Sequence, residues 1–290
     1  MNDTAQNFEK LLGEMRPKLH RYCARMTGST IDGEDVVQET LLKAFTARES
    51  AGVLDNPQAW LFRIANNAAL DFLRHRARGR LMESEEELDM IAAPDVPDLD
   101  IAATSLRSFM RLPTLQRSAV ILKDVLGHSV EEAAVITGTS EPALKSALQR
   151  GRERLRASAG ESDNIALPTI DGAARARLVA FVDGFKNGDF DVVRAMLAED
   201  VRLDLVARLK RSGKGEVGEY LGRYAASESW VYSPGLVEGR AAMLVFDRDV
   251  SLDTPAYFVI LEFDGERVVA IRDFLFARYA MEETVVRAIS

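Results

Sequence analysis

Apolar side chains recur at three- and four-residue spacing through the first 80 residues, which predicts a helical N-terminal region. The first helix is expected around residues 8–19, and a second over residues 32–45. Asn56 and Pro57 have the order of a helix cap followed by a first-turn proline, which predicts a third helix over residues 58–78.

Residues 81–105 contain two prolines and eight acidic residues with little periodicity, so they predict an extended linker. Helical spacing then returns. Ser129 and Glu132 have the spacing of a capping box, and Ser140 is positioned to cap a further helix over residues 141–157. Two helices joined by a short glycine-containing turn form a helix-turn-helix, a unit that reads DNA.

The pattern changes from Pro168 onward. Two amphipathic helices, over residues 173–187 and 190–197, precede strand-like runs, and Asp264-Gly265 is a hairpin turn signal between two of these runs. The region predicts an α+β domain with a curved antiparallel sheet. The expected strands are residues 201–206, 230–237, 241–246, 256–263 and 268–276, with a helical insert near residues 217–225.

The charge of the chain is segregated along its length. The 290 residues allow more than one domain, and a hydrophobic fraction of 47% is enough to build real cores. Residues 1–80 carry 12 basic and 10 acidic residues (net +2), and residues 106–160 carry 9 and 5 (net +4). Residues 81–105 carry eight acids and no base, and residues 161–290 carry 16 bases and 22 acids (net −6). This charge pattern is a first indication of function: two mildly basic blocks are joined by an acidic linker and followed by an acidic tail.

Several classes of protein are excluded by composition. Cys23 is the only cysteine and has no internal disulfide partner, while His20, His75 and His128 lie too far apart in sequence to suggest a metal cluster. No apolar run approaches the roughly 20 residues that span a bilayer, and the N-terminus lacks the apolar core of a signal peptide. We expect a cytoplasmic protein without a membrane segment, a metal or a cofactor.

The expected helix over residues 141–157 gathers basic and amide side chains on one side. Such a stripe can neutralise phosphates and read base edges in the major groove of DNA. The alternative is a solvated basic face on a surface helix, but the preceding helix, the turn and the local positive charge favour DNA. The stripe consists of Lys145, Gln149, Arg152 and Arg156, with Ser146 and Arg150 beside it.

Two earlier segments also carry polar side chains away from their apolar stripes. Asp35, Gln38 and Glu39 form an acidic helix face, which in a nucleic-acid-binding protein suits a protein partner, although the segment alone also fits an ordinary amphipathic helix. Trp60 fits either a base-stacking platform or core packing, of which core packing is the commoner role. The residues of this third helix that are left free to meet DNA are Arg63, Asn66, Asn67 and Arg74.

These three segments together resemble the extracytoplasmic-function (ECF) group of RNA polymerase sigma factors over about residues 8–157. GEDVVQET (residues 33–40) is similar to the family's region 2 helix that docks on the polymerase β′ clamp. NPQAWLFRIANNAALDFLR (residues 56–74) is similar to its promoter-melting and minus-ten segment. The stretch from Leu112 to Arg156 is similar to region 4, which reads the minus-35 element.

The resemblance implies a multidomain fold and a non-enzymatic role as a promoter-specificity subunit. The implied parts are a region 2 helical domain (1–80), the acidic linker (81–105), a region 4 helix-turn-helix domain (106–160) and an α+β tail domain (168–290). The implied partners are core RNA polymerase, through its β′ clamp and β flap, and promoter DNA.

The resemblance also assigns residues to these partners. Asp35, Gln38 and Glu39 would contact core polymerase, and the loop over residues 47–56 would capture a flipped base. Minus-ten DNA would be lined by Arg63, Asn66, Asn67 and Arg74. Minus-35 DNA would be read by Lys145, Ser146, Gln149, Arg150 and Arg152.

Residues from about 170 to 290 resemble the SnoaL-like, ketosteroid-isomerase-type cone that some ECF sigma factors carry at the C-terminus. Such cones enclose a pocket, and a small-molecule ligand is a candidate occupant here. No histidine lies beyond His128, so an aspartate–histidine pair is impossible in the tail, and a regulatory module is expected instead of an enzyme. The residues expected to line the pocket are Asp204, Trp230, Tyr257, Arg272 and Asp273.

Two alternatives remain open from the sequence. One is a stand-alone helix-turn-helix regulator whose tail senses a ligand, but such a regulator has no need of residues 33–74. The other is a small-molecule enzyme with DNA-binding ancestry, which predicts a buried acid with a raised pKa in the tail pocket.

Overall fold

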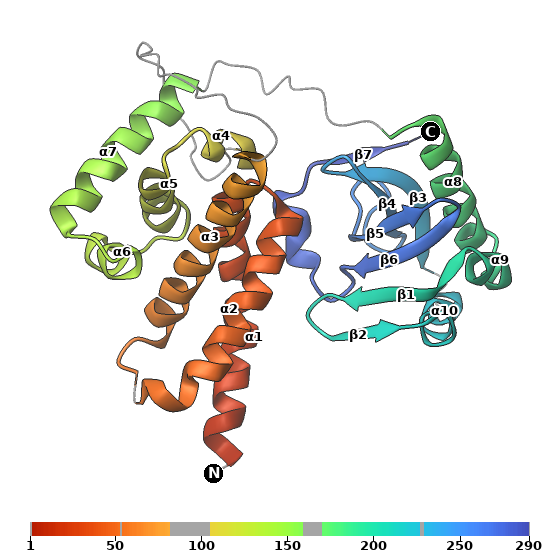
Figure 1. Cartoon of the computed structure of the whole chain (residues 1–290), viewed down its shortest axis with the longest axis horizontal. Helices are drawn as coiled ribbons and strands as arrows, with labels where there is room; N and C mark the ends of the chain where they lie inside the picture. The colour runs from red at the N-terminus through yellow and green to blue at the C-terminus, as the bar shows by residue number, and fades with distance from the viewer. Residues whose placement is uncertain (1, 53, 82–104, 159–169, 227–228, 290) are drawn as a thin grey trace. The chain divides into compact units, whose positions relative to one another are not determined.

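The computed structural model describes residues 2–52, 54–81, 105–158, 170–226 and 229–289, which belong to two compact units (Figure 1). The first unit spans residues 1–164 and the second residues 165–290. Most of the predicted linker, residues 82–104, lies outside the described residues.

Three long helices form the first part of the N-terminal unit (Figure 1): α1 (Asn2–Thr27), α2 (Thr30–Ala51) and α3 (Pro57–Leu81). Their ends are set by local chemistry, because Ser29 caps α2 and the Asn56 side chain accepts the Ala59 N–H at 3.0 Å. Gly33 is required where α1 and α2 cross, since a Cβ there would lie 2.6 Å from the backbone of Ala24. The three predicted helices are therefore confirmed, with α1 and α2 longer than predicted.

The second part of this unit consists of short helical elements that lead into one longer helix: α4 (Leu106–Met110), α5 (Thr114–Val120), a π-helical turn η2 (Ile121–Val125), α6 (Val130–Thr137) and α7 (Glu141–Ser158). The predicted capping box is present, since Ser129 and Glu132 satisfy each other's backbone N–H groups at 3.1 and 3.0 Å. Gly138 adopts a φ of 67° between α6 and α7, a conformation that glycine reaches without strain. The helix-turn-helix is confirmed.

The sequence predicts two separate helical bodies before residue 160, but the structure packs them into one unit. A continuous apolar core joins Leu19, Tyr22 and Phe62 of the first body to Ile121 and Leu148 of the second. The apolar periodicity of each segment shows that it has a buried face, but it does not specify what covers that face.

The C-terminal unit is an α+β domain, as predicted. Helices α8 (Gly172–Lys186), α9 (Phe190–Ala195) and α10 (Lys214–Gly222) accompany one sheet, and short 3₁₀ turns η3 (Arg223–Ala226) and η4 (Arg278–Glu283) complete it. The described strands have the order β2-β1-β6-β5-β4-β3-β7. They are β1 (Leu197–Leu205), β2 (Leu209–Ser212), β3 (Trp230–Val237), β4 (Arg240–Asp247), β5 (Tyr257–Asp264), β6 (Arg267–Asp273) and β7 (Val286–Ala288).

Two features of the sheet differ from the sequence prediction. Strands β1 and β6 pair in parallel, so the sheet is mixed and not purely antiparallel. The edge strands β2 and β7 were not predicted, because all four residues of β2 are exposed and β7 has only three residues. The hairpin at Asp264-Gly265 is confirmed, with β5 and β6 antiparallel and Gly265 at a φ of 51°.

One face of the sheet forms the core of the C-terminal unit. Helix α8 contributes Phe181 and Phe185, which pack with Tyr232 of β3 and Tyr257 of β5. In the described part of the chain, no helix combines the length and the apolar character that crossing a bilayer requires.

Candidate functional site

Helix α7 exposes a polar stripe opposite its buried side. Leu144, Ala147, Leu148, Gly151 and Leu155 are buried, and Gly151 is needed because a Cβ there would lie 2.7 Å from a Val120 methyl group. The opposite side leaves four of the predicted DNA-reading side chains exposed: Lys145, Ser146, Gln149 and Arg150. Because the apolar side fixes the helix against α5, this stripe is held rigidly towards solvent.

Arg152 differs from the other residues predicted to read DNA on α7. Its guanidinium makes a two-pronged ion pair with Asp124 of η2, with an Nε–Oδ2 distance of 2.9 Å. This pairing raises the pKa of Arg152 and holds the side chain against the helix-turn-helix core. In this structure Arg152 holds α7 in position. Its side chain is less exposed than those of Lys145, Gln149 and Arg150.

The four residues predicted on α3 do not share one environment. Arg63, Asn67 and Arg74 are exposed on one side of the helix, where Arg74 pairs with Asp71 at 2.7 Å. Asn66 is buried and only 3% exposed. The structure therefore brings three of these residues to one surface and separates the fourth.

Asn66 is part of a buried hydrogen-bond triad with Tyr22 of α1 and Ser118 of α5. The Tyr22 hydroxyl donates to Asn66 Oδ1 at 2.8 Å, and the Ser118 hydroxyl donates to the same oxygen at 3.1 Å. The two hydroxyls also lie 2.6 Å apart. Burial raises the pKa of the Tyr22 phenol, so this group is a neutral donor at physiological pH.

Helix α2 exposes the predicted acidic face together with two large apolar side chains that the sequence pattern does not place on a surface. Asp35 and Glu39 are exposed and Gln38 is half-buried. Leu42 is 67% exposed and Phe45 is 56% exposed, and both continue the same stripe along the helix. We call Asp35, Gln38, Glu39, Leu42 and Phe45 the α2 stripe. In the sequence, Val36/Val37, Thr40/Leu41 and Ala44/Phe45 form one apolar stripe, which predicts that Phe45 is buried, and this prediction is wrong.

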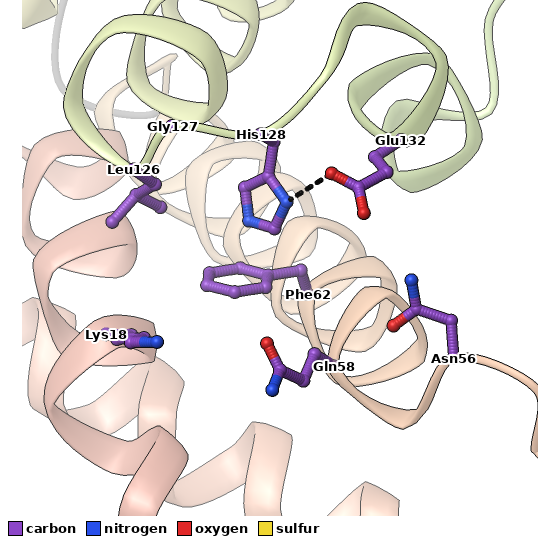
Figure 2. A pocket seen from close by; sticks show the side chains of 8 residues that line it. All are labelled: Lys18, Asn56, Gln58, Phe62, Leu126, Gly127, His128 and Glu132. Carbon is purple, nitrogen blue, oxygen red and sulfur yellow. Dashed lines mark ion pairs between the residues drawn. The ribbon is translucent and has the colours of Figure 1, made fainter.

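A pocket of about 200 Å³ lies where α1 and α3 meet the segment between η2 and α6. Figure 2 shows His128 and Glu132 facing each other above Phe62, with a His128 Nδ1–Glu132 Oε2 distance of 3.4 Å. The ring of Phe62 contacts that of His128 edge-on at 4.8 Å between centroids. The residues that line the pocket are Lys18, Asn56, Gln58, Phe62, Leu126, Gly127, His128 and Glu132.

The five residues predicted to line a pocket in the C-terminal unit divide between the two faces of the sheet. Trp230, Tyr257 and Asp273 belong to the core face, where the Trp230 and Tyr257 rings are 5.6 Å apart. Asp204 and Arg272 are paired across β1 and β6 on the opposite face, with a closest N–O distance of 3.8 Å. The structure therefore brings three of the five together.

Asp273 is completely buried and its carboxylate is fully engaged. Its Oδ2 accepts hydrogen bonds from the hydroxyls of Tyr220 (2.8 Å) and Tyr224, and its Oδ1 accepts the Leu275 N–H at 2.9 Å. Burial raises the pKa of Asp273, and the three donors only partly oppose this effect. The nearby Tyr257 hydroxyl is also buried, and no described residue serves as its hydrogen-bond partner.

We expect the raised pKa of Asp273 to make the stability of the C-terminal unit depend on pH. Between the unfolded-state pKa of about 3.9 and its raised folded-state value, the folded chain binds the extra proton, so rising pH lowers the free energy of unfolding. Asp273→Asn removes this titration. The stability advantage of wild type over the variant, on the order of 1–3 kcal/mol in acid, should therefore narrow as pH rises above about 4.

The measurement is urea unfolding of the full chain followed by Trp230 fluorescence in a Trp60→Phe background, which leaves one tryptophan. A stability difference that stays constant from pH 4 to pH 8 would contradict the raised pKa.

Comparison with known proteins gives family matches over most of the N-terminal unit. The family model for Sigma-70 region 2 matches residues 11–79, and the model for Sigma-70 region 4 matches residues 106–155. The ECF RNA polymerase sigma factor SigG of Mycobacterium tuberculosis is 28% identical over 90% of this chain and 79% of its own length. SigM of the same organism, also an ECF sigma factor, is 34% identical over 51% of this chain and 74% of its own length.

The chain also matches solved structures from outside the sigma factors. The crystal structure of a putative ketosteroid isomerase from Kribbella flavida is 18% identical and covers 35% of this chain and 76% of its own, with a TM-score of 0.27.

Proposed function

Because this chain belongs to the ECF RNA polymerase sigma factors, which direct core polymerase to promoters, we propose specific surfaces for each of its partners. The polar stripe of α7 reads minus-35 DNA, and the exposed side of α3 lines the minus-ten strand. The α2 stripe binds the polymerase β′ clamp. The second part of the N-terminal unit, α4 to α7, contacts the β flap.

The observation that carries the DNA assignment is the division of α7 into a buried apolar side and an exposed polar side. Lys145, Ser146, Gln149 and Arg150 are exposed together on a helix whose other side is anchored in the core. A recognition helix needs both features, because base edges are read only by side chains whose backbone is fixed. The test is run-off transcription by purified core polymerase with and without this protein, on promoters selected from a random library.

The polymerase assignment rests on the chemistry of the α2 stripe. An exposed leucine and phenylalanine beside two carboxylates combine an apolar contact with negative charge, a pairing suited to a basic protein surface. Lys43 contributes to the same side by pairing with Glu39 at 2.6 Å, which keeps this carboxylate in place.

For the C-terminal unit we propose a SnoaL-like regulatory module that changes sigma activity without catalysing a reaction. The mixed sheet and the helices α8 to α10 support the cone-like architecture. Fusion to the same chain gives the module a high effective concentration near the DNA- and polymerase-binding unit, so even a weak contact would be populated.

Truncation after residue 168 is expected to change promoter output by about two-fold or more in either direction, because a tethered contact of millimolar affinity is already about half-populated. The measurement compares full-length and truncated protein in run-off transcription at equal concentrations of active sigma. Identical output from the two would reject a regulatory role for the tail.

An enzymatic tail is the second candidate function, because Asp273 is the buried acid with a raised pKa that such an enzyme predicts. A general base needs an oxygen that can reach the substrate proton. Both oxygens of Asp273 already accept hydrogen bonds, and the rings of Tyr224, Trp230 and Tyr257 contact one another around it at 5.0–5.6 Å. These contacts favour the regulatory role over catalysis.

A further inference from the structure

Arg152 belongs to the polar stripe of α7, but it is held differently from its neighbours. It follows Lys145 by seven residues and Gln149 by three, so the three side chains share one side of the helix. Lys145 pairs with Glu141 at 3.7 Å within the same helix, and both side chains are largely exposed (63% and 45%). Arg152 instead pairs with Asp124 of η2, whose side chain is only 13% exposed. The orientation of Arg152 is therefore set by a different element of the fold.

Asp124 is itself fixed, because it lies in a π-helical turn whose first two residues are buried. Ile121 and Leu122 are both 0% exposed, and the Leu126 N–H donates to the Ile121 carbonyl at 3.0 Å, the i→i+5 bond of a π-turn. The Asp124 carboxylate accepts from Arg152 Nε at 2.9 Å and also from Nη2. A carboxylate and a guanidinium joined by two such bonds have a defined relative orientation.

The ion pair leaves one guanidinium nitrogen of Arg152 unused. Nε and Nη2 both donate to Asp124, whereas Nη1 has no hydrogen-bond partner among the described residues. Nη1 is also not one of the buried side-chain atoms that lack a partner, and the Arg152 side chain is 36% exposed. The N–H groups of Nη1 are therefore accessible to solvent, on a residue of the polar stripe.

Stability alone does not account for this pair. Helix α7 is already anchored by five buried residues, and a partly exposed ion pair adds little further stability. Asp124 also neutralises a positive charge beside the stripe, which weakens the non-specific attraction to DNA. The pair does fix the direction of Nη1 before any ligand arrives, so less side-chain freedom is lost when Nη1 binds one.

We propose that Asp124 is a positioning residue that orients Nη1 of Arg152 towards a backbone phosphate of the minus-35 DNA. This proposal rests on the proposed function, because it assumes that the polar stripe of α7 lies in the major groove. A guanidinium hydrogen bond to a phosphate oxygen is charge-assisted and directional, and phosphate contacts set the register of a recognition helix on the duplex. Arg152 thus fixes where α7 lies on the DNA, while the exposed residues of the stripe meet the bases.

One substitution separates orientation from net charge by the sign of its effect. Asp124→Asn removes a negative charge beside the stripe, so charge alone predicts tighter DNA binding. Loss of orientation predicts the opposite, an affinity of holoenzyme for a promoter fragment that is about five-fold lower. The matched control is Glu131→Gln, which makes the same charge change at an exposed position of α6 and should bind as tightly as wild type or slightly more tightly. Asp124→Asn that binds as tightly as this control overturns the proposal.

A second substitution separates orientation from a structural brace. Arg152→Lys keeps the positive charge and can still pair with Asp124. A lysine ammonium lacks the planar fork that holds a carboxylate through two nitrogens while a third meets a phosphate. Arg152→Lys should therefore also lower the affinity about five-fold. Wild-type affinity of this variant overturns the proposal, and circular dichroism checks that every variant keeps its helices.

The phosphate is located with promoter fragments that each carry one uncharged methylphosphonate near the minus-35 element. With wild-type holoenzyme, one position should lower the affinity about five-fold. This loss should be absent in Asp124→Asn and in Arg152→Gln, because the contact is already gone, whereas a purely structural role leaves it in place. A loss that persists in either variant overturns the positioning role.

Failure of the proposed function gives a different result. If no methylphosphonate affects wild type and Lys145→Ala/Arg150→Ala also binds as wild type does, α7 does not read minus-35 DNA and the proposed function is wrong. If no methylphosphonate affects wild type but Lys145→Ala/Arg150→Ala loses affinity, only the positioning role of Asp124 is overturned.

Discussion

Replacing Lys145 and Arg150 together with alanine is expected to reduce the affinity of holoenzyme for promoter DNA about 30-fold or more. Each side chain is exposed on the stripe of α7 and contacts no core residue that its loss would disturb. A side chain that reads a base edge contributes on the order of 1–3 kcal/mol, and each phosphate contact also releases a counterion. The measurement is equilibrium binding of holoenzyme to a minus-35 promoter fragment at several salt concentrations.

The control for this experiment is Lys10→Ala/Arg202→Ala, which removes the same formal charge from exposed positions on α1 and β1. If the control loses as much affinity as the test variant, net charge and not the α7 stripe sets promoter binding. If the salt dependence of the test variant is unchanged while specificity falls, the two residues read bases and do not contact phosphates.

Features that depend on residues close together in sequence were predictable. The capping box of Ser129 and Glu132 and the cap at Asn56 act over three residues, so the sequence alone locates the helix ends. The pairing of β5 with β6 follows from the turn residues between them. For the same reason, the polar stripe of α7 could be assigned correctly to the side opposite its apolar residues.

Features that depend on distant residues were not predictable. Asn66 has the spacing of an exposed residue beside Asn67, but its partners Tyr22 and Ser118 lie 44 and 52 residues away in the chain. Asp204 and Arg272 share a face with each other and not with Asp273, because neighbouring residues of a strand point to opposite faces. The orientation of each strand could be assigned only once its pairing was known.

Phe45 shows a different limit of sequence patterns. It continues the apolar periodicity of α2, so the pattern predicts burial, yet it is 56% exposed. Apolar periodicity indicates that a side chain is buried, either in the core of its own chain or in an interface with another protein. An apolar residue that fits the buried pattern but is exposed in the free chain is therefore a marker of an interface.

This reasoning leads to the prediction that Leu42→Glu/Phe45→Glu reduces the affinity for core polymerase about 100-fold or more. Large side chains at the centre of an interface commonly contribute 2–4 kcal/mol each, and a carboxylate at such a site adds the cost of burying a charge. Because both side chains are exposed in the free protein, the helices should fold as in wild type. The measurement is titration of labelled variant with core polymerase by fluorescence anisotropy.

The matched control is Val250→Glu, which introduces the same group at an apolar position of the C-terminal unit that is 80% exposed. It should bind core polymerase with nearly wild-type affinity, because it lies outside the α2 stripe.

Charge reversal at Asp35 and Glu39 tests the acidic part of the stripe separately and should weaken binding more at low salt than at high salt. If the Leu42 and Phe45 variant binds normally while the charge reversal does not, attraction between charges alone holds this surface, and the exposed apolar pair serves another partner.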